Sequence, residues 1–357
     1  MFGRQWFPPD SQVGISNVGL DFEEQLRLKD YDTALKLCID NINNNKNYWK
    51  RQYKRLMHLQ SYYFANKQNI SKNIAIYFNG FWPDFDESEN QILDFLNASS
   101  YELNVSYHSS KDIQSSDILL ESCYGSPLSV KYEHLTKILF LGENVRPFYS
   151  HYDYSMSFDR STYGSRNIYL PLWFLEIDHF GKHYQDRKPY PIEMFLNNQV
   201  IDYDFRKEEV VFVGNNSEPF REYILSILPS HNIKVERYGS HTRPVNDKME
   251  LLKNYKMSLC FENSFYPGYI TEKLIHALLS GTKSVYWGGL VDEEFVNHPN
   301  LILLHSEMDE SQIISRISRD ISVTGKVEVP ALLTQKQYKK RLSSTLDLLK
   351  NITYLFS

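Results

Sequence analysis

The chain has 357 residues and a formal net charge of −5 at pH 7, from 39 Lys and Arg against 44 Asp and Glu. This length is enough for two domains of ordinary size, each with its own core. A general nucleic-acid-binding protein normally carries a strong basic excess, so we expect no nucleic-acid partner.

The cysteines and the first residues bear on the cellular compartment. Cys38, Cys123 and Cys260 form neither a CxxC pair nor a metal-ligand spacing, which fits a reducing environment. The N-terminal sequence MFGRQWFPP lacks the apolar run of a signal peptide, and no segment approaches the length of a membrane span. We therefore expect a cytoplasmic protein.

Residues 21–68 show a helical pattern and lie in a predicted N-terminal appendage of residues 1–70. Apolar side chains recur at 3.6-residue spacing on either side of an Asn-rich break at 41–45. The pattern predicts a helical hairpin, which we interpret as an appendage for packing or for dimerisation.

Residues 71–175 alternate short apolar runs with helical segments. Strands are predicted at 73–78, 101–105, 117–120 and 137–141, with a helix at 91–96. Alternating strands and helices are typical of a parallel, Rossmann-like sheet, so this part is predicted to be the first α/β domain.

A second α/β domain is predicted at 206–330, after a polar, Pro-containing linker at 176–205. Its strands are predicted at 209–214, 233–237, 256–261 and 282–287, with helices near 219–228, 246–254 and 272–280. We expect the two domains to face a cleft, because ligands of open α/β sheets bind beyond the carboxyl ends of the strands.

Residues 331–357 read as a C-terminal helix that is basic at 339–341 and then apolar. Two interpretations stand. The helix makes a peripheral contact with a membrane surface, or it packs back on the first domain.

The most informative stretch runs from Phe261 to Lys273. A buried strand leads into Phe261-Glu262-Asn263-Ser264, and the following loop ends in Tyr269-Ile270-Thr271-Glu272-Lys273 at a helix start. Thr271 is a natural N-cap. Helix N-termini favour anions, and a Lys in the first turn opposes the helix dipole, so Lys273 indicates a ligand-binding role.

Two other strand ends carry candidate groups. Gly214-Asn215-Asn216-Ser217 precedes a helix with Ser217 as the expected cap, and Arg221 in its first turn either binds an anion or pairs with Glu218. With Lys273, Arg221 would form a pyrophosphate site. In the first domain, Glu143 follows strand 137–141; it is either a general base for a hydroxyl nucleophile or a solvated loop carboxylate.

Metal and nucleotide motifs are weak or missing. Asp-x-Asp pairs occur at 30/32, 84/86 and 202/204, which 44 acidic residues produce by chance. No Walker loop, GxGxxG, GxSxG or HExxH is present. We predict no metal site.

The stretch from Phe261 to Lys273 resembles the signature of the α-1,3-fucosyltransferases, glycosyltransferase family 10. Further blocks resemble that family in order: Gly142–Asn144, Asp153-Tyr154, Phe158-Asp159, Leu170–Leu172, Gly214–Asn216 with Arg221, and Tyr286–Gly289. The resemblance covers residues 73–330. The cysteine bridges of Golgi members and the heptad array of some bacterial members are missing, which favours a bacterial enzyme at the inner face of the inner membrane.

The resemblance implies a GT-B fold and inverting, metal-independent transfer of L-fucose. The donor would be GDP-fucose as co-substrate, with no cofactor. The acceptor would be a GlcNAc or glucose hydroxyl of a lipopolysaccharide, O-antigen or Lewis-type glycan. Catalytic roles are implied for Glu143, as the base, and for Glu272, and donor-binding roles for Asn215, Arg221, Glu262, Asn263, Tyr269 and Lys273.

Three other functions are alternatives to fucose transfer. The first is transfer of another GDP-linked deoxysugar, since no residue pattern identifies the sugar. The second is a non-catalytic GDP-sugar-binding protein on the same scaffold, against which Glu143 argues. The third is a glycoside hydrolase, which would need two carboxylates about 5 to 9 Å apart across a glycosidic bond.

Overall fold

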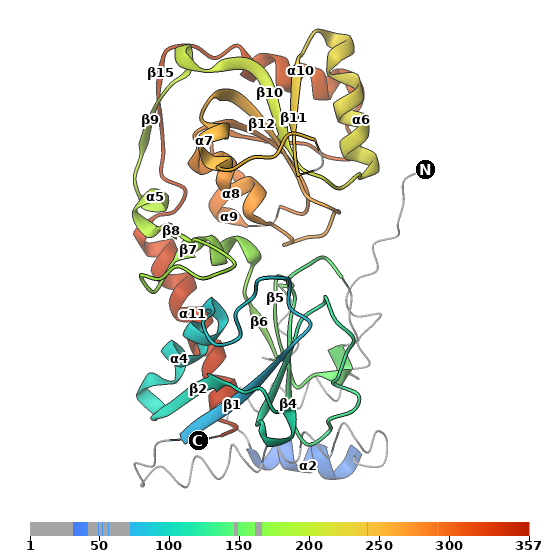
Figure 1. Ribbon diagram of the computed structural model, residues 1–357, viewed down its shortest axis with the longest axis vertical. Helices are drawn as coiled ribbons and strands as arrows, with labels where there is room; N and C mark the ends of the chain where they lie inside the picture. Colours follow the sequence, from blue (N-terminus) through green and yellow to red (C-terminus); the bar gives the residue numbers. More distant parts are fainter. Residues whose placement is uncertain are drawn as a thin grey trace. The chain divides into compact units, whose positions relative to one another are not determined.

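The computed structural model describes residues 31–41, 49, 52, 56, 72–145, 149–160, 166–240, 242–290 and 292–356. The chain divides into two compact units, each with its own parallel sheet (Figure 1). The first unit contains the residues up to Leu170, Lys182–Lys188 and Lys340–Ser357. The second contains Pro171–Gly181 and Pro189–Lys339. The predicted α/β class is confirmed.

The sheet of the first unit has six parallel strands in the order β2-β1-β3-β4-β5-β6. The strands are β1 (Lys72–Asn79), β2 (Val105–Ser109), β3 (Ile118–Glu121), β4 (Thr136–Phe140), β5 (Tyr154–Ser157) and β6 (Asn167–Tyr169). Helix α4 (Gln91–Ser100) lies against β2. The strand order reverses between β1 and β3, so ligand binding is expected at the loops after these strands.

Two predictions for this sheet need correction. The strand predicted at 101–105 is wrong, because Tyr101–Leu103 form a 3-10 helix and Asn104 adopts the left-handed conformation (φ 54°), which Asn tolerates well. Strands β5 and β6 were missed because they bury polar residues. The Oδ1 atom of Asn167 accepts hydrogen bonds from the Ser155 and Ser157 hydroxyls at 2.8 and 2.7 Å.

The sheet of the second unit has five parallel strands in the order β11-β10-β12-β13-β14. The strands are β10 (Lys207–Val213), β11 (Val235–Tyr238), β12 (Tyr255–Phe261), β13 (Lys283–Trp287) and β14 (Leu301–Leu303). The order reverses between β10 and β12, so the loops after these two strands form the switch point where doubly wound sheets bind ligands.

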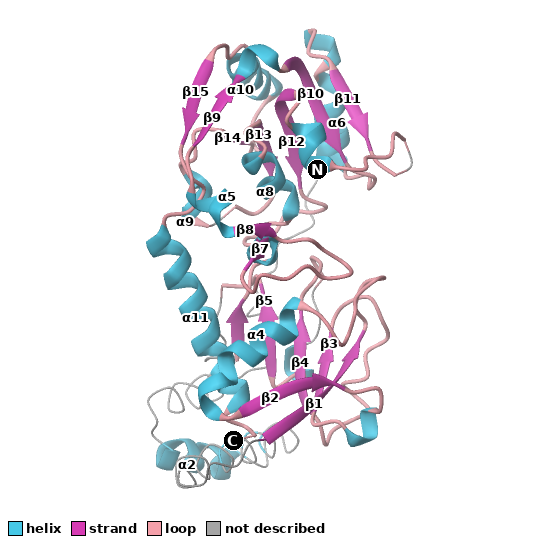
Figure 2. Ribbon diagram, turned by 60° about the vertical axis from the view of Figure 1, so that its left-hand side comes forward, coloured by secondary structure: helices cyan, strands magenta, loops and turns pink. Residues whose placement is uncertain are grey.

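Helices cover both faces of the second sheet (Figure 2). Helices α6 (Pro219–Ile227) and α10 (Glu310–Ile321) share a core with Val210 and Phe212 of β10, while α7 (Lys248–Leu252) packs on the opposite face with Val211. Helix α8 (Glu272–Leu279) lies against β12, β13 and α7. Because successive strand residues point to opposite faces, β10 is apolar on both.

Residues 176–205, predicted to be a linker, contain short elements. Strand β7 (Ile177–Asp178) pairs with β8 (Tyr190–Pro191), helix α5 (Ile192–Leu196) follows, and β9 (Gln199–Asp202) pairs antiparallel with β15 (Lys326–Val329). A further short helix, α9 (Glu293–Val296), lies between β13 and β14 in the chain. All of these elements belong to the second unit.

The two ends of the chain were predicted to be helical. Helix α11 (Gln335–Thr353) belongs to the first unit from Lys340 onward, where Tyr107 donates a hydrogen bond to the Thr353 hydroxyl at 2.9 Å. Packing on the first unit, one of the two interpretations of the tail, therefore describes these residues. Contact of the same helix with a membrane surface stays a prediction. Helix α2 (Tyr31–Asn41) supplies one helix within the predicted hairpin. Of the other residues of the hairpin, the structure describes Trp49, Gln52 and Leu56, which are helical and buried. Among the described helices, none is both long and apolar enough to span a membrane.

Candidate active site

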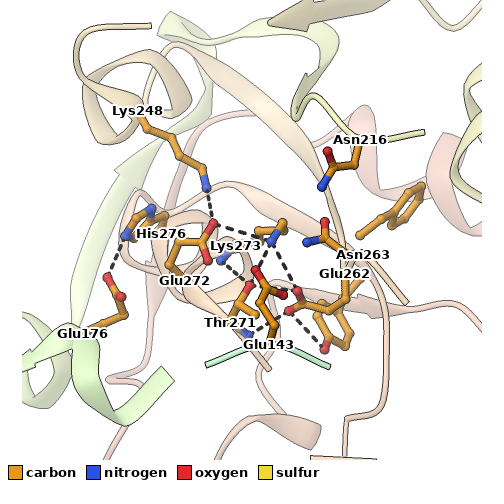
Figure 3. Close-up of polar contacts among 12 residues, drawn as sticks. Glu143, Glu176, Asn216, Lys248, Glu262, Asn263, Thr271, Glu272, Lys273 and His276 are labelled. Carbon is orange, nitrogen blue, oxygen red and sulfur yellow. Dashed lines mark hydrogen bonds and ion pairs between the residues drawn. The ribbon is translucent and has the colours of Figure 1, made fainter. Parts of the chain in front are cut away.

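A buried carboxylate at the carboxyl end of β12 contacts the start of α8 (Figure 3). Glu262 follows the last strand residue, and its side chain is 0% exposed. Its carboxylate accepts hydrogen bonds from the backbone N–H and the hydroxyl of Thr271, both at 2.8 Å. Thr271 is the N-cap of α8, as predicted, and accepts from the Lys273 backbone N–H at 3.4 Å. Glu262 thus holds the N-terminus of α8 in place through its two hydrogen bonds to Thr271.

Charges alternate around this helix start. The Lys273 Nζ atom lies 3.5 Å from Glu262 Oε2 and 3.6 Å from Glu272 Oε1, and Lys248 Nζ lies 3.5 Å from the same Glu272 oxygen (Figure 3). Two ammonium groups and two carboxylates therefore compensate one another in a partly buried position. The structure brings together Glu262, Glu272 and Lys273, as predicted, and adds Lys248.

The pKa values of the two carboxylates are shifted in opposite directions. Burial raises the pKa of Glu262, against the opposing pull of Lys273. Burial also acts to raise the pKa of Glu272, but the charges of Lys273, Lys248 and His276 together hold that pKa below its ordinary value. The Glu272 side chain is 38% exposed and that of Lys273 is 17% exposed, so both side chains are accessible from solvent.

Arg221 lies in the interior of the second unit rather than over the helix start. It is 1% exposed, and its Nη2 atom donates to the carbonyls of Phe261 and Glu262 at 2.9 and 3.1 Å. Its Nη1 atom donates to the Asn216 carbonyl, and its Nε has no partner among the described residues. Arg221 therefore joins the loops after β10 and β12 at the switch point.

The cap of α6 differs from the prediction. Glu218, not Ser217, is the N-cap, and its carboxylate accepts from the Arg221 backbone N–H at 3.0 Å. The predicted pairing of Glu218 with Arg221 thus involves the backbone of Arg221. Glu218 accepts this hydrogen bond in the manner that Asp or Ser usually does at an N-cap.

The remaining predicted donor residues divide into exposed and buried ones. Asn215 is exposed in the loop after β10, and Asn263 accepts from Arg221 Nη2 at 3.4 Å. Tyr269 is buried, and its carbonyl accepts from the Tyr286 hydroxyl at 3.3 Å. Whether these side chains contact a donor stays a prediction.

Glycines allow the loops at this edge of the sheet to approach one another. A Cβ atom on Gly239 would lie 2.3 Å from Asn215 Oδ1, and one on Gly289 would lie 1.6 Å from the Tyr266 carbonyl oxygen. Gly289 also accepts from the Gly268 N–H at 2.7 Å. Side chains at these positions would push the loops apart, so steric crowding explains why glycine occupies positions 239 and 289.

One pair in the second unit gave no signal in the sequence. His276, one turn after Glu272 on α8, lies with its Nε2 atom 2.9 Å from Glu176 Oε2 (Figure 3). The Tyr190 ring packs edge-on against His276 at a centroid distance of 5.3 Å. Lys248 was missed for the same reason: its partner Glu272 lies outside helical spacing, so only the fold joins them.

In the first unit, Glu143 follows β4 after Leu141 and Gly142, and it is half-buried. The Tyr124 hydroxyl donates a hydrogen bond to Glu143 Oε1 at 3.0 Å. Burial first, and then the charge of Glu143, raise the pKa of Tyr124, so the phenol stays a donor at neutral pH. Tyr124 had no signal in the sequence.

The Asp-x-Asp pairs serve local structure where they are described. Asp86 accepts from the Ser88 N–H at 2.8 Å, Asp202 caps a 3-10 helix, and Asp204 accepts from the Gly325 N–H at 2.8 Å. Among the described residues, no three His, Cys, Asp or Glu side chains gather as a metal-binding group.

Two doubly wound units, with the candidate groups at the carboxyl ends of the strands, define the chain as a GT-B-type α/β protein. A crystal structure of an α1,3-fucosyltransferase with GDP-fucose matches it with a TM-score of 0.53 at 21% identity, over 79% of this chain and 91% of that one. A second crystal structure of an α1,3-fucosyltransferase gives the same TM-score at 20% identity, over 80% and 92%.

Sequence comparison gives the family. Residues 76–176 match the N-terminal domain of alpha-(1,3)-fucosyltransferase FucT, and residues 205–305 match the C-terminal domain of glycosyltransferase family 10 (fucosyltransferase). Together these matches cover more than half of the chain, which belongs to glycosyltransferase family 10, a family of fucosyltransferase enzymes.

Individual relatives agree with this membership. The chain is 25% identical to the alpha-(1,3)-fucosyltransferase FucT of Helicobacter pylori over 286 residues, which are 71% of this chain and 58% of the relative. It is 46% identical to the human 4-galactosyl-N-acetylglucosaminide 3-alpha-L-fucosyltransferase FUT6 over 63 residues, 17% of each protein. The match thus spans little more than half the length of the bacterial relative.

Proposed function

We propose that the chain is an inverting α-1,3-fucosyltransferase that moves L-fucose from GDP-fucose to a GlcNAc or glucose hydroxyl of a glycan. The observation that carries this proposal is the charge-compensated group of Lys248, Glu272, Lys273 and Glu262 at the N-terminus of α8. A helix start with a partly exposed ammonium group suits a pyrophosphate.

The reaction is a single displacement. The acceptor hydroxyl gives its proton to the Glu143 carboxylate, and its oxygen bonds to the anomeric carbon from the face opposite GDP. The bond between that carbon and the phosphate oxygen breaks, and its electron pair leaves with GDP. Lys273 and the N–H groups of the α8 start stabilise the leaving pyrophosphate. Glu272, which its lysines keep ionised, stabilises positive charge at the anomeric carbon.

We propose that some of the donor-binding residues contact the donor directly and that the others hold these residues in place. Asn215, Asn263 and Lys273 contact the donor. Arg221, Glu262 and Tyr269 are buried, so they act on the donor by fixing the loops after β10 and β12 and the α8 start. No metal is proposed for this step, since Lys273 and the helix start supply positive charge.

The biological setting is part of the same proposal. We place the enzyme in the bacterial cytoplasm, at the inner face of the inner membrane, where it would build lipopolysaccharide, O-antigen or Lewis-type chains. The free thiols of Cys123 and Cys260 agree with a reducing compartment. Dimerisation through the N-terminal helices and peripheral membrane contact through α11 are proposed with it.

A screen of donors against acceptors tests the proposal. Purified chain is incubated with GDP-fucose, GDP-mannose or GDP-rhamnose and with GlcNAc-, N-acetyllactosamine- or glucose-terminated acceptors, with and without EDTA, and products are analysed by mass spectrometry. We expect a fucosylated product, of α-1,3 linkage by NMR, that survives EDTA. Transfer from another GDP-sugar alone would support the alternative donor, binding of GDP-fucose without transfer would support a non-catalytic protein, and a strict Mn²⁺ requirement would overturn the metal-independent step.

A further inference from the structure

Tyr124 lies on the loop that follows β3, beside the carboxylate proposed as the base. The side chain is 47% exposed, yet its hydroxyl is directed to Glu143 Oε1 at 3.0 Å. An exposed phenol held against a carboxylate loses rotamer freedom and solvent hydrogen bonds, so its loop must be held in place for the contact to persist.

A buried carboxylate holds that loop. Glu121, at the end of β3, is 1% exposed, and it accepts hydrogen bonds from the N–H groups of Leu128 and Ser129 at 2.5 and 3.0 Å. It also accepts from the Asn79 side-chain amide at 2.6 Å and from the Tyr152 hydroxyl at 3.2 Å. Each of these contacts lies within the first unit, and together they fix both ends of the loop that carries Tyr124.

Two glycines bring the same loop against the end of β1. A Cβ atom on Gly80 would lie 2.9 Å from the Gly125 nitrogen, and one on Gly125 would lie 2.8 Å from the Gly80 Cα atom. Gly80 has a φ of 69°, and its carbonyl accepts from the Tyr124 N–H at 2.8 Å. The backbone position of Tyr124 is therefore set from both sides.

The surrounding groups keep the phenol protonated. In the first unit, the charge of Glu143 acts on two titratable groups, Tyr124 and Cys123, and Arg187 acts on Tyr124. Burial raises the pKa of Cys123, so its thiol is neutral at pH 7. Trp82 packs edge-on against Tyr124 at a centroid distance of 6.4 Å, and it lies under the Arg187 guanidinium at 5.1 Å.

We propose that Tyr124 is a positioning residue for Glu143: its hydroxyl orients the carboxylate toward the acceptor hydroxyl, whose proton the carboxylate accepts. This inference rests on the proposed function, in which Glu143 is the base. Without the hydrogen bond from Tyr124, the carboxylate has more rotational freedom. The carboxylate would also sample orientations that do not meet the acceptor hydroxyl.

The main test is Tyr124→Phe, which removes only the hydroxyl. We expect kcat to fall by about 10-fold with the KM for the acceptor changed by less than about twofold. Tyr101→Phe, at an exposed tyrosine of the same unit, is the matched control and should match the wild type.

The outcomes separate the two proposals. If the wild type transfers fucose and Glu143→Gln does not, but Tyr124→Phe keeps the wild-type kcat, the positioning role is overturned and the proposed function stands. An unchanged kcat with a raised KM for the acceptor would make Tyr124 an acceptor-binding residue, which also overturns the positioning role. If the wild type transfers no fucose, the proposed function fails.

A measurement without substrate tests the contact itself. Tyrosine labelled with 13C at Cζ is titrated by NMR in the wild type and in Glu143→Gln. We expect the pKa of Tyr124 to fall in the variant, because the charge and the hydrogen bond that help to raise it are gone, and that of Tyr101 to be the same in both proteins. An unchanged Tyr124 titration would contradict the contact, whatever the enzymatic result.

Discussion

Arg221 and Lys273 are cationic residues near the starts of α6 and α8, two helices that pack on the same sheet. The structure gives the two residues opposite environments. Arg221 is 1% exposed and donates to backbone carbonyls of the loops after β10 and β12. Lys273 keeps 17% of its side chain exposed and lies between two carboxylates. Similar positions in the sequence thus hold one cation that is buried and joins the loops and one that stays partly exposed between carboxylates.

The difference follows from the shape of the two cations. A guanidinium has five donors in a plane and is weakly hydrated, so it can satisfy several carbonyls in the interior. An ammonium group is a compact, strongly hydrated charge, which favours a position with access to solvent and to an anionic ligand. Arg and Lys both suggest a pyrophosphate site when they occur at helix starts in a sequence. In the fold, the two residue types can nevertheless have different roles.

The largest effect is expected for Arg221→Ala. The carbonyls of Asn216, Phe261 and Glu262 lose their donor and a cavity forms, so the free energy of unfolding should fall by about 3–5 kcal/mol. Urea denaturation measures this. Arg221→Lys keeps the charge but not the planar set of donors, and should give an intermediate loss. Unchanged stability with lost GDP affinity would instead make Arg221 a direct ligand of the donor.

A smaller effect, and on binding rather than stability, is expected for Lys273→Ala. Loss of an ammonium group from the pyrophosphate site should weaken GDP binding about 10- to 100-fold, or about 1.4–2.7 kcal/mol by calorimetry. The control is Lys234→Ala, at an exposed lysine just before β11, which should leave GDP affinity unchanged. Equal affinity in Lys273→Ala and the wild type would remove Lys273 from the donor site.

The smallest effect concerns the pH dependence of stability. In the folded state the lysines hold the pKa of Glu272 below its ordinary value of about 4.5, which is its pKa in the unfolded chain. At pH values above 4.5, ionised Glu272 therefore stabilises the folded state. That contribution is lost as pH falls below 4.5. Glu272→Gln should therefore lower Tm at pH 7 more than at pH 3.5. A difference in Tm from the wild type that is equal at both pH values would contradict the paired state of Glu272.

Local patterns in the sequence were enough to predict the elements around the site. The apolar run of β12 and the Thr271 cap of α8 depend on neighbouring residues, so spacing alone identifies them. Glu262, Glu272 and Lys273 are close together in the chain, and their grouping follows from that helix start. The family signature covered the same residues.

Other features depend on contacts between distant segments. Lys248 meets Glu272 only because α7 and α8 pack together on one face of the sheet. The burial of Arg221 depends on carbonyls about forty residues away in the chain. Strands β5 and β6 bury Ser155, Ser157 and Asn167 through their mutual hydrogen bonds, which hydrophobic periodicity does not detect. Such cases need the fold before they can be recognised.

The central claim, that the chain transfers fucose with Glu143 as base, is tested most directly by Glu143→Gln. Calorimetry with GDP-fucose and turnover with a GlcNAc-terminated acceptor are measured on the wild type, on this variant and on the exposed-site control Glu133→Gln. We predict GDP-fucose affinity within about twofold of the wild type and turnover reduced by about 10²- to 10⁴-fold for Glu143→Gln only. Turnover near the wild-type rate in Glu143→Gln would contradict the account.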